Sequence, residues 1–416
     1  MDALVLFAFI LLGVIALWLL YGEGLIRKPW AAALCAILVA LTLALRARVF
    51  DVETDDYRWF LSTWFQYYRD NGGFRAFGTL PPYCNYHVPY LYLLALFSYL
   101  PGKDLYLIKL LSVIFDLLLA WGSMKLLGRI TQNKGLRLAL FFTLLLWPTV
   151  FLNGALWGQC DGICVSLLVL GLWLALDDRP ILSMSMMALA FAFKLQAVFV
   201  LPICAVLWFT GKYRWQHFLI FPLVYLLAIL PAVLMGQPFL EMLLFHFKQT
   251  DTINAYLSAN SPSVFALFWR IQDGTEQARH AATMGIAAAG VYTVSLLALA
   301  WVQRKRLSER SILVLSLLFA IGIPFLLPYM HDRYFYAADV LSLILAFAIP
   351  SVFLAAPLVE FASFLGYFAY LSRYLSPKGA HYLLYMYYGS YALLAALVLA
   401  VFGYLISLKP RSRRRA

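Results

Sequence analysis

An acidic cluster near residue 50 holds the side chains best suited to proton transfer. Asp51, Glu53, Asp55 and Asp56 fall within six residues, between an apolar stretch and an aromatic-rich one. Ionisable groups beside such apolar segments are costly, so each one marks a candidate functional site. A carboxylate held there can act as a general base on an attacking hydroxyl. The competing interpretation is an acidic loop that simply faces water.

Polar groups that could balance the charge of such a reaction occur much later in the chain. Lys194 interrupts an apolar run, and His331 and Arg333 follow another run in the stretch His-Asp-Arg-Tyr-Phe-Tyr. Gln159 and Asp161 stand between two further apolar segments. Simpler roles are open for four of them. Lys194 and Arg333 could reach to a membrane interface, and Gln159 and Asp161 could cap a helix.

A carboxylate near cations suits one reaction in particular. An acceptor hydroxyl attacks a sugar whose leaving group is a lipid phosphate, the carboxylate takes the proton, and the cations neutralise the departing phosphate. Because the lipid tail of such a donor stays in the bilayer, this chemistry predicts an enzyme that is built into a membrane.

The composition requires a membrane protein. Of 416 residues, 64% are hydrophobic and only 12% are charged, and the mean hydropathy is +0.82. Soluble domains carry about 25% charged residues. Apolar runs long enough to cross about 30 Å of hydrocarbon recur from end to end. We therefore expect an all-α polytopic bundle of about 11–13 transmembrane helices, with spans near 3–21, 30–46, 105–128, 138–157, 161–177, 181–195, 197–211, 215–235, 281–302, 310–329, 335–349, 353–371 and 383–407.

The spans are expected to form a single domain over residues 1–416, with two large outer loops at 47–104 and 236–280. Within the first loop, the aromatic-rich stretch and the stretch 81–100 predict interfacial helices. The short segments around Lys194 predict a hairpin that only partly crosses. Lysines and arginines gather in the short loops and the C-terminal tail. This pattern predicts a multi-pass cell-membrane protein whose basic face is cytoplasmic and whose candidate site faces outside.

Several other features have structural interpretations. The net charge of +12 does not predict nucleic-acid binding, because the basic residues are scattered through short loops. The five cysteines lie mostly in apolar runs and predict no disulfide framework. Cys160 and Cys164 share a helix face without a neighbouring histidine, which favours core packing over metal binding. Asp116 and Glu360 lie deep in apolar segments and are expected to pair across helices.

A set of ordered motifs resembles the GT-C superfamily of membrane glycosyltransferases, in particular bacterial proteins related to the second mannosyltransferase of GPI-anchor assembly. The likeness spans roughly residues 50–345 and rests on six stretches in the superfamily's order, namely Thr54-Asp-Asp56-Tyr57, Asn71-Gly-Gly73, Asn85-Tyr-His-Val-Pro89, Trp157-Gly-Gln-Cys-Asp161, Phe193-Lys194-Leu-Gln196 and His331-Asp-Arg-Tyr-Phe335.

The resemblance implies a GT-C fold and inverting transfer of a mannose-like hexose from a polyprenyl-phosphate-linked donor to a lipid- or glycan-linked acceptor. It implies a general base at Asp56, with Asp55 as the competing carboxylate. We expect Arg333, Lys194 and His331 to bind the donor phosphate. The sugar and acceptor are expected to contact Gln159, Asp161, Tyr57, Trp59, Trp64, His87 and Tyr334. Membrane lipids are the other expected partners. No cofactor is certain, and a divalent cation held by the acidic cluster stays open.

Two rival functions would need other features. A transporter or flippase of a lipid-linked glycan would need two related halves and charges at mid-membrane, and the chain shows no convincing internal repeat. A cell-envelope glycan polymerase or ligase would be favoured by arginine pairs in a large outer loop. The outer loops here carry isolated arginines and an acidic cluster instead.

Overall fold

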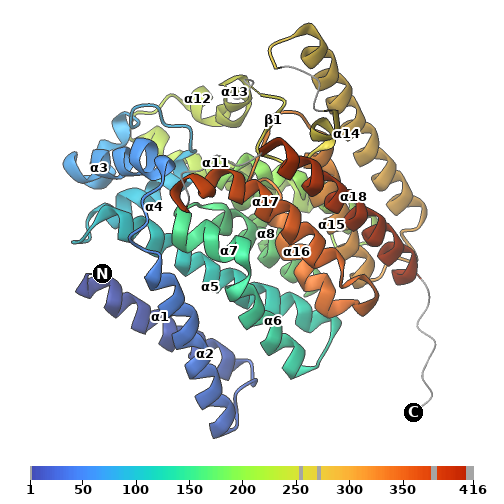
Figure 1. The fold of residues 1–416 in the computed structure, drawn as a ribbon, viewed down its shortest axis with the longest axis horizontal. Helices are drawn as coiled ribbons and strands as arrows, with labels where there is room; N and C mark the ends of the chain where they lie inside the picture. The colour runs from blue at the N-terminus through green and yellow to red at the C-terminus, as the bar shows by residue number, and fades with distance from the viewer. Residues whose placement is uncertain (1, 253–255, 269–272, 376–381, 409–416) are drawn as a thin grey trace.

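The computed structural model describes residues 2–252, 256–268, 273–375 and 382–408 (Figure 1). These residues are overwhelmingly helical, which confirms the predicted all-α polytopic class. Their two short strands, β1 (Ser258–Ala259) and β2 (Met330–His331), form one parallel pair, with Ser258 opposite Met330. This pair joins the second predicted outer loop to the segment that carries Arg333.

The first half of the chain supplies the helices that surround the candidate site. They are α1 (Ala3–Gly22), α2 (Pro29–Arg48), η1 (Tyr57–Leu61), α3 (Ser62–Asp70), η2 (Gly73–Gly78), α4 (Val88–Ser98), α5 (Asp104–Ile130), α6 (Lys134–Leu146), α7 (Pro148–Phe151), η3 (Leu152–Trp157), α8 (Asp161–Leu176), α9 (Pro180–Phe193), η4 (Leu195–Phe199) and α10 (Ile203–Phe209).

The second half adds further long helices and the short elements of the second loop. They are η5 (Trp215–Leu219), α11 (Ile220–Leu234), α12 (Phe239–Leu243), α13 (Phe245–Thr252), η6 (Val264–Phe268), α14 (Glu276–Val302), α15 (Glu309–Leu326), α16 (Tyr336–Ala348), η7 (Pro350–Val352), α17 (Ala355–Leu375) and α18 (Tyr382–Ser407). Local signals set several of the helix starts. Proline opens α2, α4, α7 and α9, where its missing N–H would have no partner in any case.

Eight helical segments of the described chain are long and apolar enough to cross a membrane. A ninth is added if α6 and the segment Pro148–Trp157, which meet at a bend of 50°, form one span. The bend falls at Pro148, where the ring forbids a continuous helix. Shorter apolar helices, among them α8, α9 and α16, account for most of the difference from the predicted 11–13. The predicted span 197–211 is replaced by η4 and the seven-residue α10, which agrees with a hairpin at Lys194 that only partly crosses.

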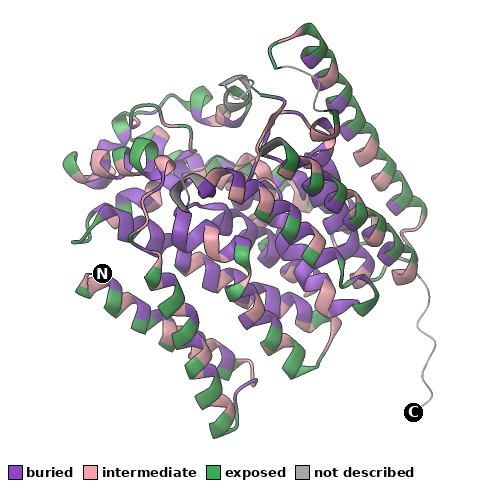
Figure 2. Cartoon of the chain, viewed as in Figure 1, coloured by how far each residue is buried: buried purple, intermediate pink, exposed green. Residues whose placement is uncertain are grey.

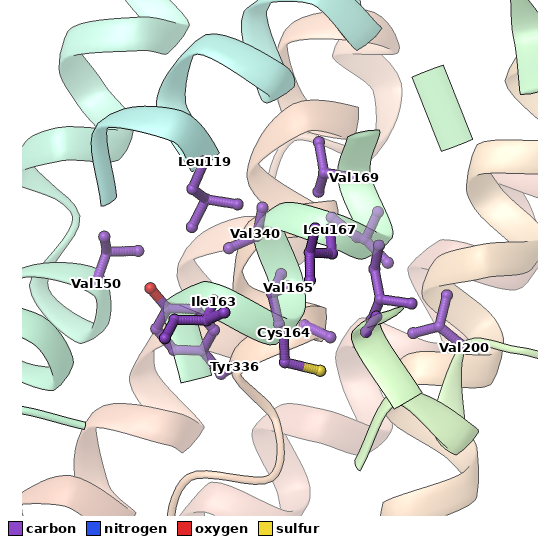
Figure 3. Packing of buried hydrophobic residues seen from close by; sticks show 14 of the residues in the cluster. Leu119, Val150, Ile163, Cys164, Val165, Leu167, Val169, Val200, Tyr336 and Val340 are labelled. Atoms are coloured by element: carbon purple, nitrogen blue, oxygen red, sulfur yellow. The ribbon is translucent and has the colours of Figure 1, made fainter. Parts of the chain in front are cut away.

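The outer helices of the bundle expose apolar side chains, whereas the central ones bury theirs. Figure 2 shows α1, α2 and α14 with much of their surface exposed, around a largely buried interior. Their exposed residues include Phe7, Ile37 and Met284, as expected for surfaces that face lipid. In the interior, α8 packs against α5 and α16, and Figure 3 shows Leu119, Val165 and Val340 among the buried side chains of this core.

The first loop contains the helices η1, α3 and α4 where interfacial helices were predicted, and their position at the interface stays a prediction. At 11 residues, α4 is too short to cross a bilayer alone. The entry to this loop is fixed by Lys109 of α5, which donates hydrogen bonds to the carbonyls of Val49, Phe50 and Val52 at 3.1, 3.0 and 2.6 Å. These bonds satisfy carbonyls that the end of α2 leaves open, and they set the backbone that leads to Asp56.

Candidate active site

Four segments that are far apart in the sequence meet at one end of the bundle. Asp56 precedes η1, Gln159 and Asp161 lie where η3 gives way to α8, Lys194 joins α9 to η4, and Arg333 follows β2. The guanidinium of Arg333 lies 3.8 Å from Asp56 Oδ2 and 3.6 Å from Asp161 Oδ2. The structure therefore brings the expected carboxylate and cations together.

One oxygen of Asp56 is held firmly by the protein. Trp157 Nε1 and Gln159 Nε2 donate hydrogen bonds to Asp56 Oδ2 at 2.9 and 2.8 Å. The backbone N–H of Asp56 donates to the Tyr370 hydroxyl at 3.2 Å. Oδ1 accepts no hydrogen bond from any residue that the structure describes, and the side chain keeps 26% exposure. The carboxylate is thus fixed through one oxygen and open at the other.

The side-chain amide of Gln159 bridges Asp56 and Arg333. Its N–H group donates to Asp56, while its carbonyl oxygen accepts hydrogen bonds from Arg333 and, at 3.0 Å, from the Tyr86 hydroxyl. The residue is only 2% exposed. Its backbone is held too, because Ser112 donates to the Gln159 carbonyl at 2.8 Å. Gln159 therefore orients the carboxylate and the guanidinium relative to each other.

Lys194 and Asp161 form a buried ion pair beside this bridge. Lys194 Nζ lies 2.5 Å from Asp161 Oδ1, and Asn153 donates to Asp161 Oδ2 at 2.9 Å. Burial alone would lower the pKa of Lys194, but the Asp161 carboxylate holds it above its ordinary value. The lysine does not reach out to an interface. The N-terminus of α8 has no side-chain cap, so the capping role considered for Gln159 and Asp161 is not observed.

The segment around Arg333 carries two groups with shifted acidities. Burial, aided by the charges of Arg333 and Lys194, lowers the pKa of His331 to about 4. Burial raises the pKa of Asp332 to about 7, while Arg333, whose Nε lies 3.5 Å from Asp332 Oδ1, opposes the rise. At neutral pH His331 is uncharged, so the positive charge of the site comes from Arg333 and Lys194.

Irregular backbone places these side chains. η1 and η3 are both π-helical, a geometry that often marks functional sites. η1 follows Asp56 directly, and η3 ends at Trp157. Gly158 then adopts φ 76°, a left-handed conformation that glycine reaches without strain. That turn lets Trp157 and Gln159 both direct N–H groups at Asp56.

The aromatic residues expected to contact sugar have varied surroundings. Trp59 is 72% exposed, and Trp64 is buried and donates to the Pro82 carbonyl. The Tyr57 hydroxyl donates to Asp104. Both ring nitrogens of His87 lie within 3.0 Å of backbone carbonyls, those of Ala192 and Met242. Tyr334 packs against the His331 ring. Sugar contacts at these five positions stay predictions, and Asp55 lies beside the base without a tested role.

Four contributors to the site were not singled out in the sequence. Trp157 holds Asp56 and lies under Arg333, whose guanidinium carbon is 4.9 Å from the indole ring. Tyr370 of α17 stacks on Trp157 at 4.4 Å. Tyr86 and Asn153 complete the set. Trp157 and Tyr86 lie inside the recognised motifs, next to Gln159 and His87 in the sequence. This proximity in the sequence could have identified them as site residues. Tyr370 is one aromatic residue among many in an apolar helix, and nothing in the sequence indicated its role in the site.

The described residues group no three His, Cys, Asp or Glu side chains as ligands for a metal ion. A divalent cation therefore stays a prediction without an assigned ligand set. The two deep carboxylates have the partners expected across helices. Asp116 pairs with Arg46 at 3.1 Å, and Glu360 accepts hydrogen bonds from Thr149. All five cysteines are unpaired in the structure.

Comparison with known proteins identifies the family. The family model described as "Glycosyltransferase family 87" matches residues 85–327, which include Gln159, Asp161 and Lys194. No curated protein matches the chain. The match agrees with the resemblance to GT-C glycosyltransferases, whereas the narrower likeness to a mannosyltransferase stays untested. The chain therefore belongs to glycosyltransferase family 87, a family of GT-C-type glycosyltransferases.

Proposed function

We propose that the protein transfers a mannose-like hexose from a polyprenyl-phosphate-linked donor to a lipid- or glycan-linked acceptor at the outer face of the membrane. The observation that carries this proposal is the Asp56 carboxylate, held through Oδ2 and open at Oδ1, next to the partly buried guanidinium of Arg333. The proposed general base and the residue proposed to bind the donor phosphate thus lie within one small cluster.

In the proposed reaction Asp56 is the general base. The acceptor hydroxyl attacks the anomeric carbon of the sugar, and the bond from that carbon to the phosphate oxygen breaks. Asp56 Oδ1 takes the hydroxyl proton as the new glycosidic bond forms. The hydrogen bonds from Trp157 and Gln159 to Oδ2 keep the carboxylate oriented toward the acceptor. A single displacement of this kind inverts the anomeric configuration.

Arg333 and Lys194 are proposed to stabilise the leaving phosphate. Its charge rises as the bond to the sugar breaks, and fixed cations in a poorly hydrated site stabilise that charge strongly. Lys194 pairs with Asp161, and Arg333 faces the carboxylates of both Asp56 and Asp161. The donor phosphate must therefore draw Arg333 away from these carboxylates. Because a nearby positive charge lowers the pKa of a carboxyl group, this exchange makes Asp56 a stronger base for the acceptor proton.

The membrane setting supports a lipid-linked donor. The site lies at the end of a bundle in which eight helical segments of the described residues are suited to crossing a membrane. A polyprenyl tail can stay among the lipid-facing helices while its phosphate reaches Arg333, so the lipid need not leave the bilayer.

The decisive experiment measures transfer by purified protein supplied with a panel of polyprenyl-phosphate sugars, following release of the lipid phosphate. Asp56→Asn keeps the shape of the side chain but removes its basicity, so we expect activity to fall by about 100-fold or more. Asp55→Asn is the matched control, because it makes the same change one residue away. Full activity in Asp56→Asn, or loss only in Asp55→Asn, would refute the assignment of the base.

A further inference from the structure

A cavity at the opposite end of the bundle lies outside the machinery described above. It measures about 950 Å³ and is bounded by the C-terminal end of α5, the N-terminal end of α15 and the last residues of α18, on the right in Figure 1. α5 spans 27 residues from Asp104, which bonds to Tyr57 and Ser62, to Ile130 on the cavity wall. Ser112 of the same helix bonds to Gln159, so at 1.5 Å per residue the 18 residues from Ser112 to Ile130 separate the cavity from that part of the candidate active site by about 27 Å.

The wall of this cavity is strongly basic. Arg129, Lys305, Arg306 and Arg310 line it, against the single carboxylate of Glu309. Arg129 is neutralised by Asp177 at 3.3 Å and by Glu309 at 3.2 Å. Among the described residues, no acidic side chain pairs with Lys305 or Arg306. The cavity therefore holds uncompensated positive charge.

Apolar side chains line the same cavity. Ile130, Ile349 and Ile406 line it next to the basic groups. The preference of lysine and arginine for cytoplasmic loops explains why positive charges occur at this end. It does not explain their gathering around a hollow beside three isoleucines. A hollow with both surfaces fits an anionic phosphate that carries an apolar tail.

We propose that this cavity binds a phosphate group, with Lys305 and Arg306 supplying the charge that recognises it. The three isoleucines favour the headgroup of an anionic phospholipid over a soluble phosphate, because acyl chains would cover these apolar side chains. Basic pockets between membrane helices bind lipid headgroups in this way. The inference does not depend on the transfer reaction.

The test titrates the full-length protein in neutral detergent with short-chain phosphatidylglycerol, phosphatidylcholine or inorganic phosphate, and follows the apparent Tm. We expect a saturable rise with phosphatidylglycerol and none with phosphatidylcholine. Each cation near such a site contributes about 1 kcal/mol, so Lys305→Gln with Arg306→Gln should weaken the apparent affinity roughly 30-fold. Both side chains are exposed on a turn, so the variant should fold.

The matched control is Arg27→Gln with Lys28→Gln, which removes the same charge from another loop at this end of the bundle. That loop contacts Lys125, Arg137 and Lys134 through Glu23 and Gly24. The control should bind phosphatidylglycerol as the unmodified protein does. A saturable response to inorganic phosphate alone that is lost in Lys305→Gln with Arg306→Gln would support a phosphate site here. The natural ligand would then be a soluble phosphate and not a lipid headgroup. Equal weakening in both double variants, or equal responses to the two lipids, would overturn the proposal.

Discussion

At the scale of single residues, Gln159 has the most informative set of contacts, because it joins the proposed base to the proposed phosphate ligand. Gln159→Leu removes the donor to Asp56 and the acceptor of Arg333 without adding charge. Hydrogen bonds to charged groups contribute about 1.5–3 kcal/mol, so we expect kcat to fall about 10- to 100-fold. Transfer assays with saturating donor measure this effect.

The control for Gln159→Leu is Gln237→Leu. Gln237 is also buried, but its side chain donates to the Phe77 carbonyl and touches none of the site residues. If the loss of activity came from a general loss of folding, Gln159→Leu and Gln237→Leu would both lose activity. In that case Gln159→Glu should lose no more activity than Gln159→Leu. We expect Gln159→Glu to be the more damaging change, because it sets a second carboxylate against Asp56.

Asp332 predicts a pH dependence of donor binding. Its pKa of about 7 lies above the ordinary 3.8, chiefly because of burial. The contribution of Asp332 to the free energy of unfolding is therefore fully present at low pH and is lost as the pH rises through 7. Above pH 7 its carboxylate also competes for Arg333. The KM for donor should rise severalfold between about pH 6 and about pH 8.5.

The variant Asp332→Asn isolates this effect. It cannot ionise, so its donor KM should stay flat over the same pH window. His331 should contribute nothing there, because its pKa near 4 keeps it neutral. If the asparagine variant retained the rise in KM, the titrating group would have to be another one.

At the scale of elements, the close approach of α17 to the Arg333 segment predicts a sensitive glycine. A Cβ atom on Gly366 would lie 2.8 Å from the Asn260 carbonyl oxygen and 3.3 Å from that of Asp332. Gly366→Ala must therefore displace the backbone next to Arg333. We expect a loss of about 1–3 kcal/mol in the free energy of unfolding, with kcat/KM lowered by more than the stability loss explains.

Gly290→Ala on α14 is the control for this prediction, because nothing lies within 4 Å of the added Cβ. It should be neutral or slightly stabilising, since alanine favours helix more than glycine does. Thermal unfolding and transfer assays on Gly366→Ala and Gly290→Ala compare their stability and their kcat/KM. Equal behaviour of the two would show that the packing at Gly366 does not position the site.

Helix existence was predictable, but helix length was less so. Hydrophobicity alone identified the long outer helices, because a long apolar run predicts a spanning helix whichever helices pack against it. It could not show that the run 138–157 bends at Pro148, or that 197–211 breaks into η4 and α10. Those breaks depend on which neighbours satisfy the freed backbone groups. The packing of neighbouring helices determines where such breaks occur, and a hydropathy profile of one sequence contains no information about that packing.

At the scale of the whole molecule, the sequence predicted which charged residues belong together but not which atoms meet. Asp56, Lys194 and Arg333 were expected at one end of the bundle, and the structure places them there. The direct partner of Lys194 proved to be Asp161 rather than the base. Such pairings depend on helix rotation and on the π-helical turns before Gln159, and neither leaves a periodic signal in the chain.

The two ends of the bundle are predicted to face opposite sides of the membrane, and this orientation is testable. Tyr83, which is 90% exposed, lies at the end with the candidate active site, and Lys305 lies at the basic end. Cysteine can be placed at either position in a Cys84→Ser background, because the four remaining native cysteines are buried.

A membrane-impermeant maleimide applied to intact cells should label Tyr83→Cys and leave Lys305→Cys unlabelled, whereas permeabilised cells should label both. The physical reason is that short loops rich in lysine and arginine are retained on the cytoplasmic side. Labelling of Lys305→Cys alone in intact cells would invert the topology. The proposed donor phosphate would then be released on the cytoplasmic side, and transfer at the outer face would have to be abandoned even if Asp56 proved to be the base.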